Sequence, residues 1–138
     1  MIVKGFEHRR KAYMVSASKA AALTALESGQ LVGLDASGEV ILCAGATRGF
    51  LSFSDLNATR DNVTDHGGQV SFAMGSVAVT VDNGSFVSGE TYVFGTRLMA
   101  NASGKLTPIT EGTTSEALVC ATALGAETNN TLRILQVG

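Results

Sequence analysis

Short apolar runs separated by turn residues constrain this chain more than any other feature of its sequence. The clearest run is 76–82 (SVAVTVD), in which Val77, Val79 and Val81 alternate with small or polar residues. A period of two residues places the three valines on one face of a β-strand. The other runs are bounded by turn-forming residues, which is typical of strands joined by tight connections. The expected strands are 30–34, 39–43, 49–54, 69–74, 76–82, 91–94, 97–100, 105–109, 117–122 and 131–137.

About ten short strands at this spacing predict an all-β fold, a small β-barrel or β-sandwich of short antiparallel strands. The dipeptide Asn83-Gly84 predicts a two-residue type I′ turn, in which both residues have positive φ. The same need for positive φ accounts for Gly38 and Gly104 at two other predicted turns. Residues 17–27 fit either a short helix or an extended approach to the first hairpin, and the pattern does not decide between them.

The composition is that of a folded domain with little charge. A length of 138 residues suits one domain, and a hydrophobic share of 45% is too high for a disordered chain. No apolar run approaches the roughly 18–20 residues of a membrane helix, so we expect no membrane partner. The charged share is 16%, against roughly 25% in an average domain. A surface so poor in charge suits contact with a protein partner.

The charges are unevenly distributed along the chain. Residues 1–14 hold four basic residues and one acidic residue, whereas residues 15–138 hold six basic and eleven acidic residues. We therefore interpret 1–14 as an extended, basic N-terminal arm and 15–138 as a single β domain, with a solvated, frayed terminus as the alternative for 1–14. Few positive charges on an acidic body, with no basic face that carries aromatic residues, argue against a nucleic-acid partner.

The two cysteines, Cys43 and Cys120, each lie inside an apolar run. Free cysteine behaves as a small hydrophobic residue, so we expect two buried free thiols. The first residues lack the long apolar segment of a signal peptide. We therefore expect synthesis in a cytoplasm, where disulfides are rare.

Residues 55–68 form a long polar stretch that predicts an exposed loop, with Asp61, Asn62, Asp65 and His66 as its candidate functional residues. The sequence lacks a Gly-x-Ser-x-Gly elbow, closely spaced Cys and His pairs, and a phosphate-binding glycine motif. We therefore expect no catalytic residues, no metal site and no cofactor. A small hydrolase that uses His66 with Asp61 or Asp65 stays an alternative.

Three stretches resemble the capsid cement or head decoration proteins of tailed bacteriophages. Residues 26–44 (LESGQLVGLDASGEVILCA) are similar to a block of that family with an ordered entry, a strand, a short turn and a return strand. Residues 88–109 repeat this pattern, and residues 117–137 resemble the ending of the family, with Gly125 before a last strand. The loop 55–68 and the alanine-rich stretch 17–27 depart from the family pattern.

The resemblance implies a structural virion protein that binds the outside of an assembled capsid and bridges subunits of the major capsid protein. It implies a homotrimer on the capsid and no enzymatic activity. It also implies that an extended N-terminal arm reaches onto the shell, where it can add a strand to an exposed edge. The arm residues expected to contact the capsid are Lys4, Phe6, Arg9, Arg10, Lys11 and Tyr13.

A different virion β-module, such as a tail, fibre or receptor-binding piece, is the alternative function. It predicts binding to a glycan or cell surface through the loop 55–68. Capsid attachment and glycan binding therefore separate the two hypotheses.

Overall fold

The computed structural model describes residues 1–4, 11–45, 47–54, 68–110, 112 and 114–137. Within them the fold is all-β, as predicted, with two antiparallel sheets, no α-helix and no closed barrel. The elements are β1 (Ile2–Lys4), β2 (Lys11–Ser18), β3 (Leu31–Leu34), β4 (Val40–Leu42), β5 (Phe50–Leu51), β6 (Gln69–Asp82), β7 (Arg97–Ala100), β8 (Leu106–Pro108), the 3-10 helix η1 (Thr114–Leu118), β9 (Ala121–Ala123) and β10 (Thr131–Gln136).

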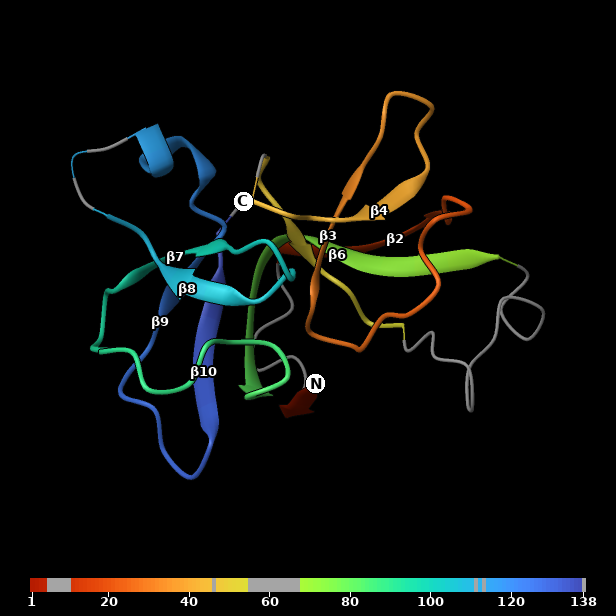
Figure 1. The fold of residues 1–138 in the computed structure, drawn as a ribbon. Coiled ribbons are helices and arrows are strands. Elements are labelled where there is room, and N and C mark those ends of the chain that lie inside the picture. Colours follow the sequence, from red (N-terminus) through yellow and green to blue (C-terminus); the bar gives the residue numbers. More distant parts are fainter. Residues whose placement is uncertain (5–10, 46, 55–67, 111, 113, 138) are drawn as a thin grey trace.

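The larger sheet has seven strands in the order β1-β6-β10-β9-β7-β8, with β2 also paired to β6 (Figure 1). The smaller sheet has the order β4-β3-β5. The residue pair Ser52 and Phe72 forms an isolated antiparallel bridge that joins the end of β5 to β6. Strand β6 is therefore one of the elements through which the two sheets meet; the bridge between Lys19, just after β2, and Val40 of β4 is another connection.

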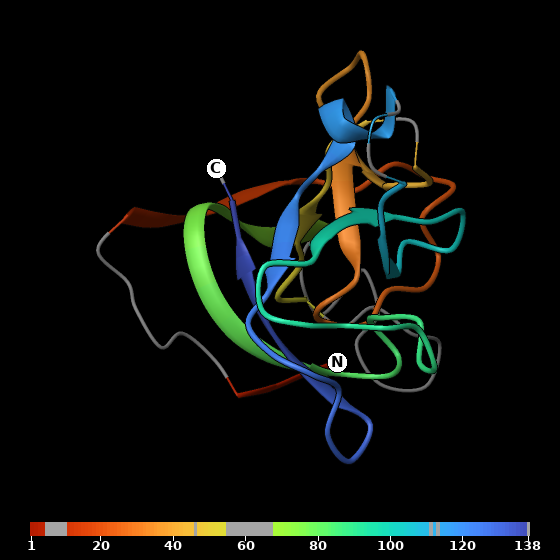
Figure 2. The ribbon, with the colours of Figure 1, turned by 90° about the vertical axis from the view of Figure 1, so that its left-hand side faces the viewer.

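Strand β6 is 14 residues long and strongly curved (Figure 2). Its first half pairs with β2, and its second half pairs with β1 on one edge and β10 on the other. The expected strands 69–74 and 76–82 are therefore one strand. The two runs join because Gly75 adopts a φ of +89° without interrupting the pairing with β2.

Two clusters of buried residues lie on opposite faces of β6. Val77, Val79 and Val81 are fully buried in the larger cluster, which confirms that they share one face. Val70 and Phe72 belong to the smaller cluster. Because successive side chains of a strand point to opposite faces, the even-numbered residues at the start of β6 and its later odd-numbered residues pack into different cores.

The strands begin earlier than expected, because both described parts of residues 1–14 pair with β6. Ile2 lies opposite Val81, and β2 starts at Lys11. Ile2 also packs against the larger core cluster, and the Met1 amino group donates hydrogen bonds to other parts of the fold. Residues 2–4 and 11–14 of the predicted arm are therefore strands of the larger sheet.

Three other sequence expectations are resolved by the structure. Residues 17–27 contain no helix: β2 ends at Ser18, and the chain continues through a turn to the buried side chains of Leu23 and Leu26. Residues 91–94 are not a strand, because the chain there turns through Gly95 with a φ of +95°. The expected strand 117–122 is shortened by η1, and β9 starts only at Ala121.

The turns follow the predicted chemistry at two glycines and depart from it at a third. Gly38 and Gly104 have positive φ, as expected. Gly84 does not, although the Ser85 N–H donates to the Asp82 carbonyl across this turn. The two-residue turn with positive φ at both positions instead joins β9 to β10, at Asn129 and Asn130.

Candidate interaction surface

The residues predicted to contact a capsid fall into two groups. Lys4 ends β1, Lys11 begins β2, and Tyr13 lies within β2. Tyr13 is therefore the predicted contact residue whose surroundings can be followed in atomic detail. The remaining predicted arm and loop residues lie outside the described residues: Phe6, Arg9, Arg10, Asp61, Asn62, Asp65 and His66.

Tyr13 and Met74 form an exposed apolar pair across β2 and β6. Their Cα atoms are partners in the sheet, so the two side chains share one face. Tyr13 is 71% exposed and Met74 is 38% exposed. The next pair on this face, Val15 and Phe72, packs into the smaller core cluster. The apolar face therefore extends past the end of the core and stays uncovered by the described residues.

The opposite face of the same two strands is mainly polar. The hydroxyl groups of Ser16 and Ser71 lie 2.9 Å apart, and the Gln69 amide donates to the Ser18 hydroxyl at 3.0 Å. Toward the start of β2 this face is apolar: Met14 is 49% exposed, and its sheet partner Ala73 is buried in the larger core cluster. Apolar side chains thus project on both sides of β2 near its start.

The outer edge of β2 is open in the part of the chain that the structure describes. Strand β2 pairs only with β6 along its eight residues, apart from a bridge between Lys19 and Val40 just after it. An unpaired strand edge presents free N–H and C=O groups that can bind another strand. We name the outer edge of β2, with Tyr13, Met14 and Met74, the β2 edge surface.

A second exposed apolar site lies at the turn before β7. Val93 is 59% exposed and Phe94 is 78% exposed, whereas Tyr92 beside them is buried. The turn is held by hydrogen bonds between Val93 and Thr96. This turn projects only two apolar side chains and offers no strand edge, so the β2 edge surface is the larger candidate for a macromolecular contact.

The cysteines are placed as predicted, since Cys43 and Cys120 are free and buried. The Cys43 thiol donates to the Thr47 carbonyl at 3.1 Å. Burial, together with the nearby Cys43 sulfur, raises the pKa of the Cys120 thiol to about 12. A thiol that is buried and protonated at neutral pH is a poor nucleophile, so Cys120 serves packing in the core.

The described residues contain no group of three or more His, Cys, Asp or Glu residues that could hold a metal ion. The helices in the same part of the chain include none that is long and apolar enough to span a bilayer.

Comparison with known proteins finds no matching family model, no matching curated protein and no matching solved structure.

No strand was expected over the full length of β2, the element that carries this surface. The signal was present in 13–18, where Tyr13, Val15 and Ala17 alternate with Met14 and two serines. Residues 13 and 14 were assigned to the arm together with the charged residues before them, and no strand was predicted for 15–18. The apolar alternation of 13–18 was the better guide, because these side chains pack against β6 and its core.

Proposed function

We propose that this chain is a structural virion protein that binds the outer surface of an assembled phage capsid. In this function it bridges subunits of the major capsid protein and stabilises the shell. The observation that carries the proposal is the β2 edge surface, an eight-residue strand edge that none of the described residues pairs with, flanked by exposed apolar side chains. The resemblance of its hairpins to capsid cement proteins supplies the class of partner.

The β2 edge surface suits a partner that contributes an extended segment. Strand addition supplies backbone hydrogen bonds along the edge, and the alternating side chains supply specificity. Tyr13 offers a large and rigid apolar surface with a polar tip, which is the kind of side chain that dominates binding energy in interfaces. Met14 and Met74 add adaptable apolar surface beside it.

The basic residues around β1 and β2 supply a second, electrostatic contribution. Lys4 is the last residue of β1 and Lys11 is the first residue of β2. Arg9 and Arg10 lie between them in the sequence. These charges favour a capsid surface that is acidic at the contact, and their contribution weakens as salt increases. Assembly as a homotrimer on the shell multiplies the individual contacts through multivalency.

Binding to capsids tests this function directly. Capsids that lack the protein are mixed with the purified chain and sedimented, and their resistance to heat is measured with and without it. We expect the chain to sediment with capsids and to raise the temperature at which they open. Met14→Lys and Tyr13→Ser should lower the affinity about tenfold or more, since each removes apolar contact and Met14→Lys adds a charge at the edge.

Phe94→Ser is the matched control, because Phe94 is as exposed as Tyr13 but lies outside the β2 edge surface. It should bind capsids like the unsubstituted chain. Failure of the unsubstituted chain to bind any capsid would overturn the proposal, and glycan binding without capsid binding would favour a tail or fibre module. Equal affinity of the Tyr13, Met14 and Phe94 variants would remove the β2 edge surface from the contact.

A further inference from the structure

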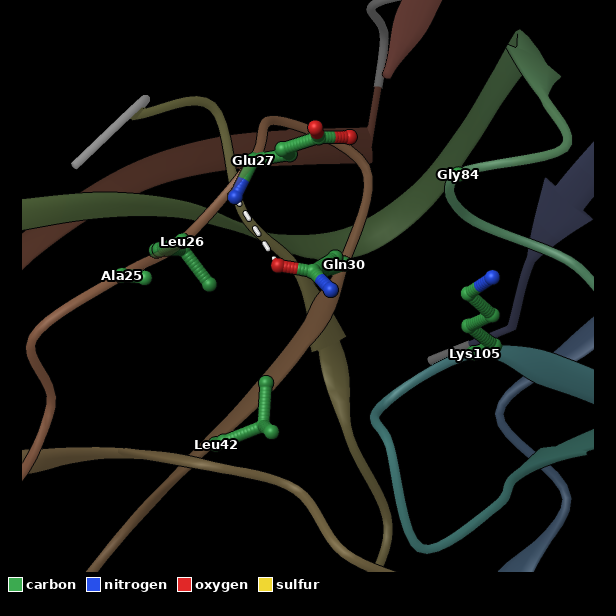
Figure 3. Close-up of a pocket in the computed structure, with 7 residues that line it drawn as sticks. All are labelled: Ala25, Leu26, Glu27, Gln30, Leu42, Gly84 and Lys105. Atoms are coloured by element: carbon green, nitrogen blue, oxygen red, sulfur yellow. Dashed lines mark hydrogen bonds between the residues drawn. The ribbon is translucent and has the colours of Figure 1, made fainter. Parts of the chain in front are cut away.

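A pocket of about 370 Å³ lies away from the β2 edge surface, between the segment before β3, the end of β4 and the loops near β8 (Figure 3). Its volume is at the lower end of the range for ligand sites, about 300–1,000 Å³. Leu26 and Leu42 give it an apolar wall. Gln30 and Lys105 contribute polar groups, and Ala25, Glu27 and Gly84 complete the lining.

Gln30 and Lys105 both have donors to spare for a ligand. The Gln30 side-chain oxygen accepts a hydrogen bond from the Glu27 N–H at 2.9 Å, which fixes the amide and turns its nitrogen away from that bond (Figure 3). The Lys105 ammonium donates to the Asn83 carbonyl at 3.3 Å, and a lysine carries three donors. Amide and ammonium donors above an apolar wall form a recognition pattern for a carboxylate with an apolar group.

The acidic groups at the rim are already engaged with another cation. The Glu27 carboxylate lies 3.9 Å from the Met1 amino group and points away from the Gln30 amide (Figure 3). The Asp82 carboxylate accepts from the Met1 amino group at 2.6 Å and from the Gly84 N–H at 3.0 Å. Burial works to raise the pKa of Asp82, but these hydrogen bonds outweigh it and hold the pKa below its usual value.

Gly84 keeps the rim open on the side of Glu27. A Cβ atom at this position would come within 2.6 Å of the Glu27 carboxylate oxygen and 3.1 Å of the Asp82 carboxylate oxygen. The backbone at Gly84 has no positive φ, so turn geometry does not require glycine there. The lack of a side chain at Gly84 therefore leaves space at the rim of the pocket.

We propose that this pocket binds a small carboxylate with a branched apolar group of about the size of a leucine side chain. The carboxylate bridges the Gln30 amide nitrogen and the Lys105 ammonium, and the apolar group packs against Leu26 and Leu42. This inference is independent of capsid binding, because none of these residues belongs to the β2 edge surface.

Two small probes test the chemistry of recognition. The full chain is titrated with 4-methylpentanoate and with the neutral 4-methyl-1-pentanol, and the amide signals are followed by NMR. We expect saturable shifts around Gln30, Leu42 and Lys105 with the acid, and at least tenfold weaker binding of the alcohol. The absence of saturable shifts, or equal affinity for the two probes, would overturn the proposal.

Two substitutions assign the binding to the named groups. Gln30→Glu keeps an oxygen that accepts from the Glu27 N–H but replaces the amide donor with a negative charge, and it should abolish binding of the acid. Lys105→Met should weaken binding of the acid about tenfold and leave the alcohol unchanged. Lys19→Met is the matched control, because its ammonium donates to the Ala20 carbonyl outside the pocket; a loss of affinity equal to that of Lys105→Met would contradict the assignment.

The carboxylate could come from a free acid or from the end of a protein chain. N-acetyl-L-leucine, which resembles a C-terminal leucine, distinguishes the two sources. Tighter binding of N-acetyl-L-leucine than of 4-methylpentanoate assigns the site to a chain end, and the reverse order assigns it to a free acid. The Lys105→Met variant should still bind capsids, which separates failure of this inference from failure of the proposed function.

Discussion

At the scale of single residues, Gln136 makes the most unusual contribution to the core. It is fully buried, and its amide nitrogen donates to the carbonyls of Ala73 and Gly75, each at 2.9 Å. Its side-chain oxygen accepts from the Leu51 N–H at 2.7 Å. One side chain on β10 therefore satisfies backbone groups on both β5 and β6, next to the glycine at which β6 has positive φ.

Replacing Gln136 should destabilise the fold strongly. Gln136→Leu keeps the volume of the side chain but leaves one N–H and two carbonyls buried without these partners, so we expect the free energy of unfolding to fall by about 2–4 kcal/mol. Urea denaturation measures the change. Gln69→Leu is the control, because Gln69 is exposed on β6 and should change the stability by less than about 0.5 kcal/mol. Equal losses for both variants would show that the buried bonds contribute little.

Tyr92 links stability to alkaline pH. Burial, with smaller contributions from the carboxylates of Glu90 and Glu127, raises the pKa of Tyr92 to about 12 from 10.0. The neutral phenol is therefore favoured in the folded state. The resulting stability is fully present below pH 10 and is lost as the pH rises toward about 12.

Tyr92→Phe should make the free energy of unfolding less steep against pH between 10 and 12. At neutral pH the substitution should lower the free energy of unfolding by about 1 kcal/mol, because the Tyr92 hydroxyl donates to the Val87 carbonyl in the folded state. Chemical denaturation at a series of pH values measures both effects. A slope that Tyr92→Phe leaves unchanged would contradict the assignment.

At the scale of elements, β6 depends on one glycine. Gly75 has a φ of +89° in the middle of the strand, a conformation that costs a residue with a side chain about 1–2 kcal/mol. Gly75→Ala should lower the free energy of unfolding by about that amount in thermal or urea denaturation. Gly125→Ala is the control, because Gly125 has no positive φ and a Cβ there meets nothing within 4 Å. A neutral Gly75→Ala would mean that β6 can form without positive φ at this position.

Most strands could be predicted from the sequence because local alternation and turn residues agree. Residues 97–100 became β7, and 131–137 became β10, one residue shorter. The strand predicted at 91–94 does not form, because Tyr92 packs its ring against Phe86 in the core while the chain on either side turns outward. The type I′ turn predicted at Asn83-Gly84 does not form. The Asp82 carboxylate accepts a hydrogen bond from the Gly84 N–H, which favours a different local turn.

The candidate site was less predictable than the fold. The role of Tyr13 as a contact residue stays a prediction from the sequence. Its pairing with Met74 could not be predicted, because it depends on the register between β2 and β6, which joins residues far apart in the sequence. The pocket depends on Gln30 and Lys105, which come from separate hairpins. Local periodicity carries no information on which hairpins lie side by side.

At the scale of the whole molecule, β6 and β3 join the two core clusters into one structure. β6 places Val79 in the larger cluster and Val70 in the smaller one, and β3 does the same with Leu31 and Val32. If the β6 residues of one cluster lost their packing, the strand that also contributes residues to the other cluster would be disrupted. We therefore expect the domain to unfold in a single cooperative transition.

Val70→Ala and Val79→Ala test this coupling, since both valines are fully buried on the same strand. Each should lower the free energy of unfolding by about 2 kcal/mol, from lost apolar burial and the cavity that remains. Far-UV circular dichroism and the NMR signals of both clusters should give the same midpoint in each variant. Earlier loss of the smaller cluster alone in Val70→Ala would show two independent units.

The open edge of β2 also bears on how copies of this chain behave toward each other. A strand edge left without a partner invites stacking into fibres, but β2 begins at Lys11 and is followed by Lys19. If two copies aligned antiparallel along this edge, Lys11 of each copy would lie beside Lys19 of the other. Like charges so placed repel. If β2 adds a strand of another protein, as proposed, we expect that strand to carry carboxylates near its ends rather than lysines.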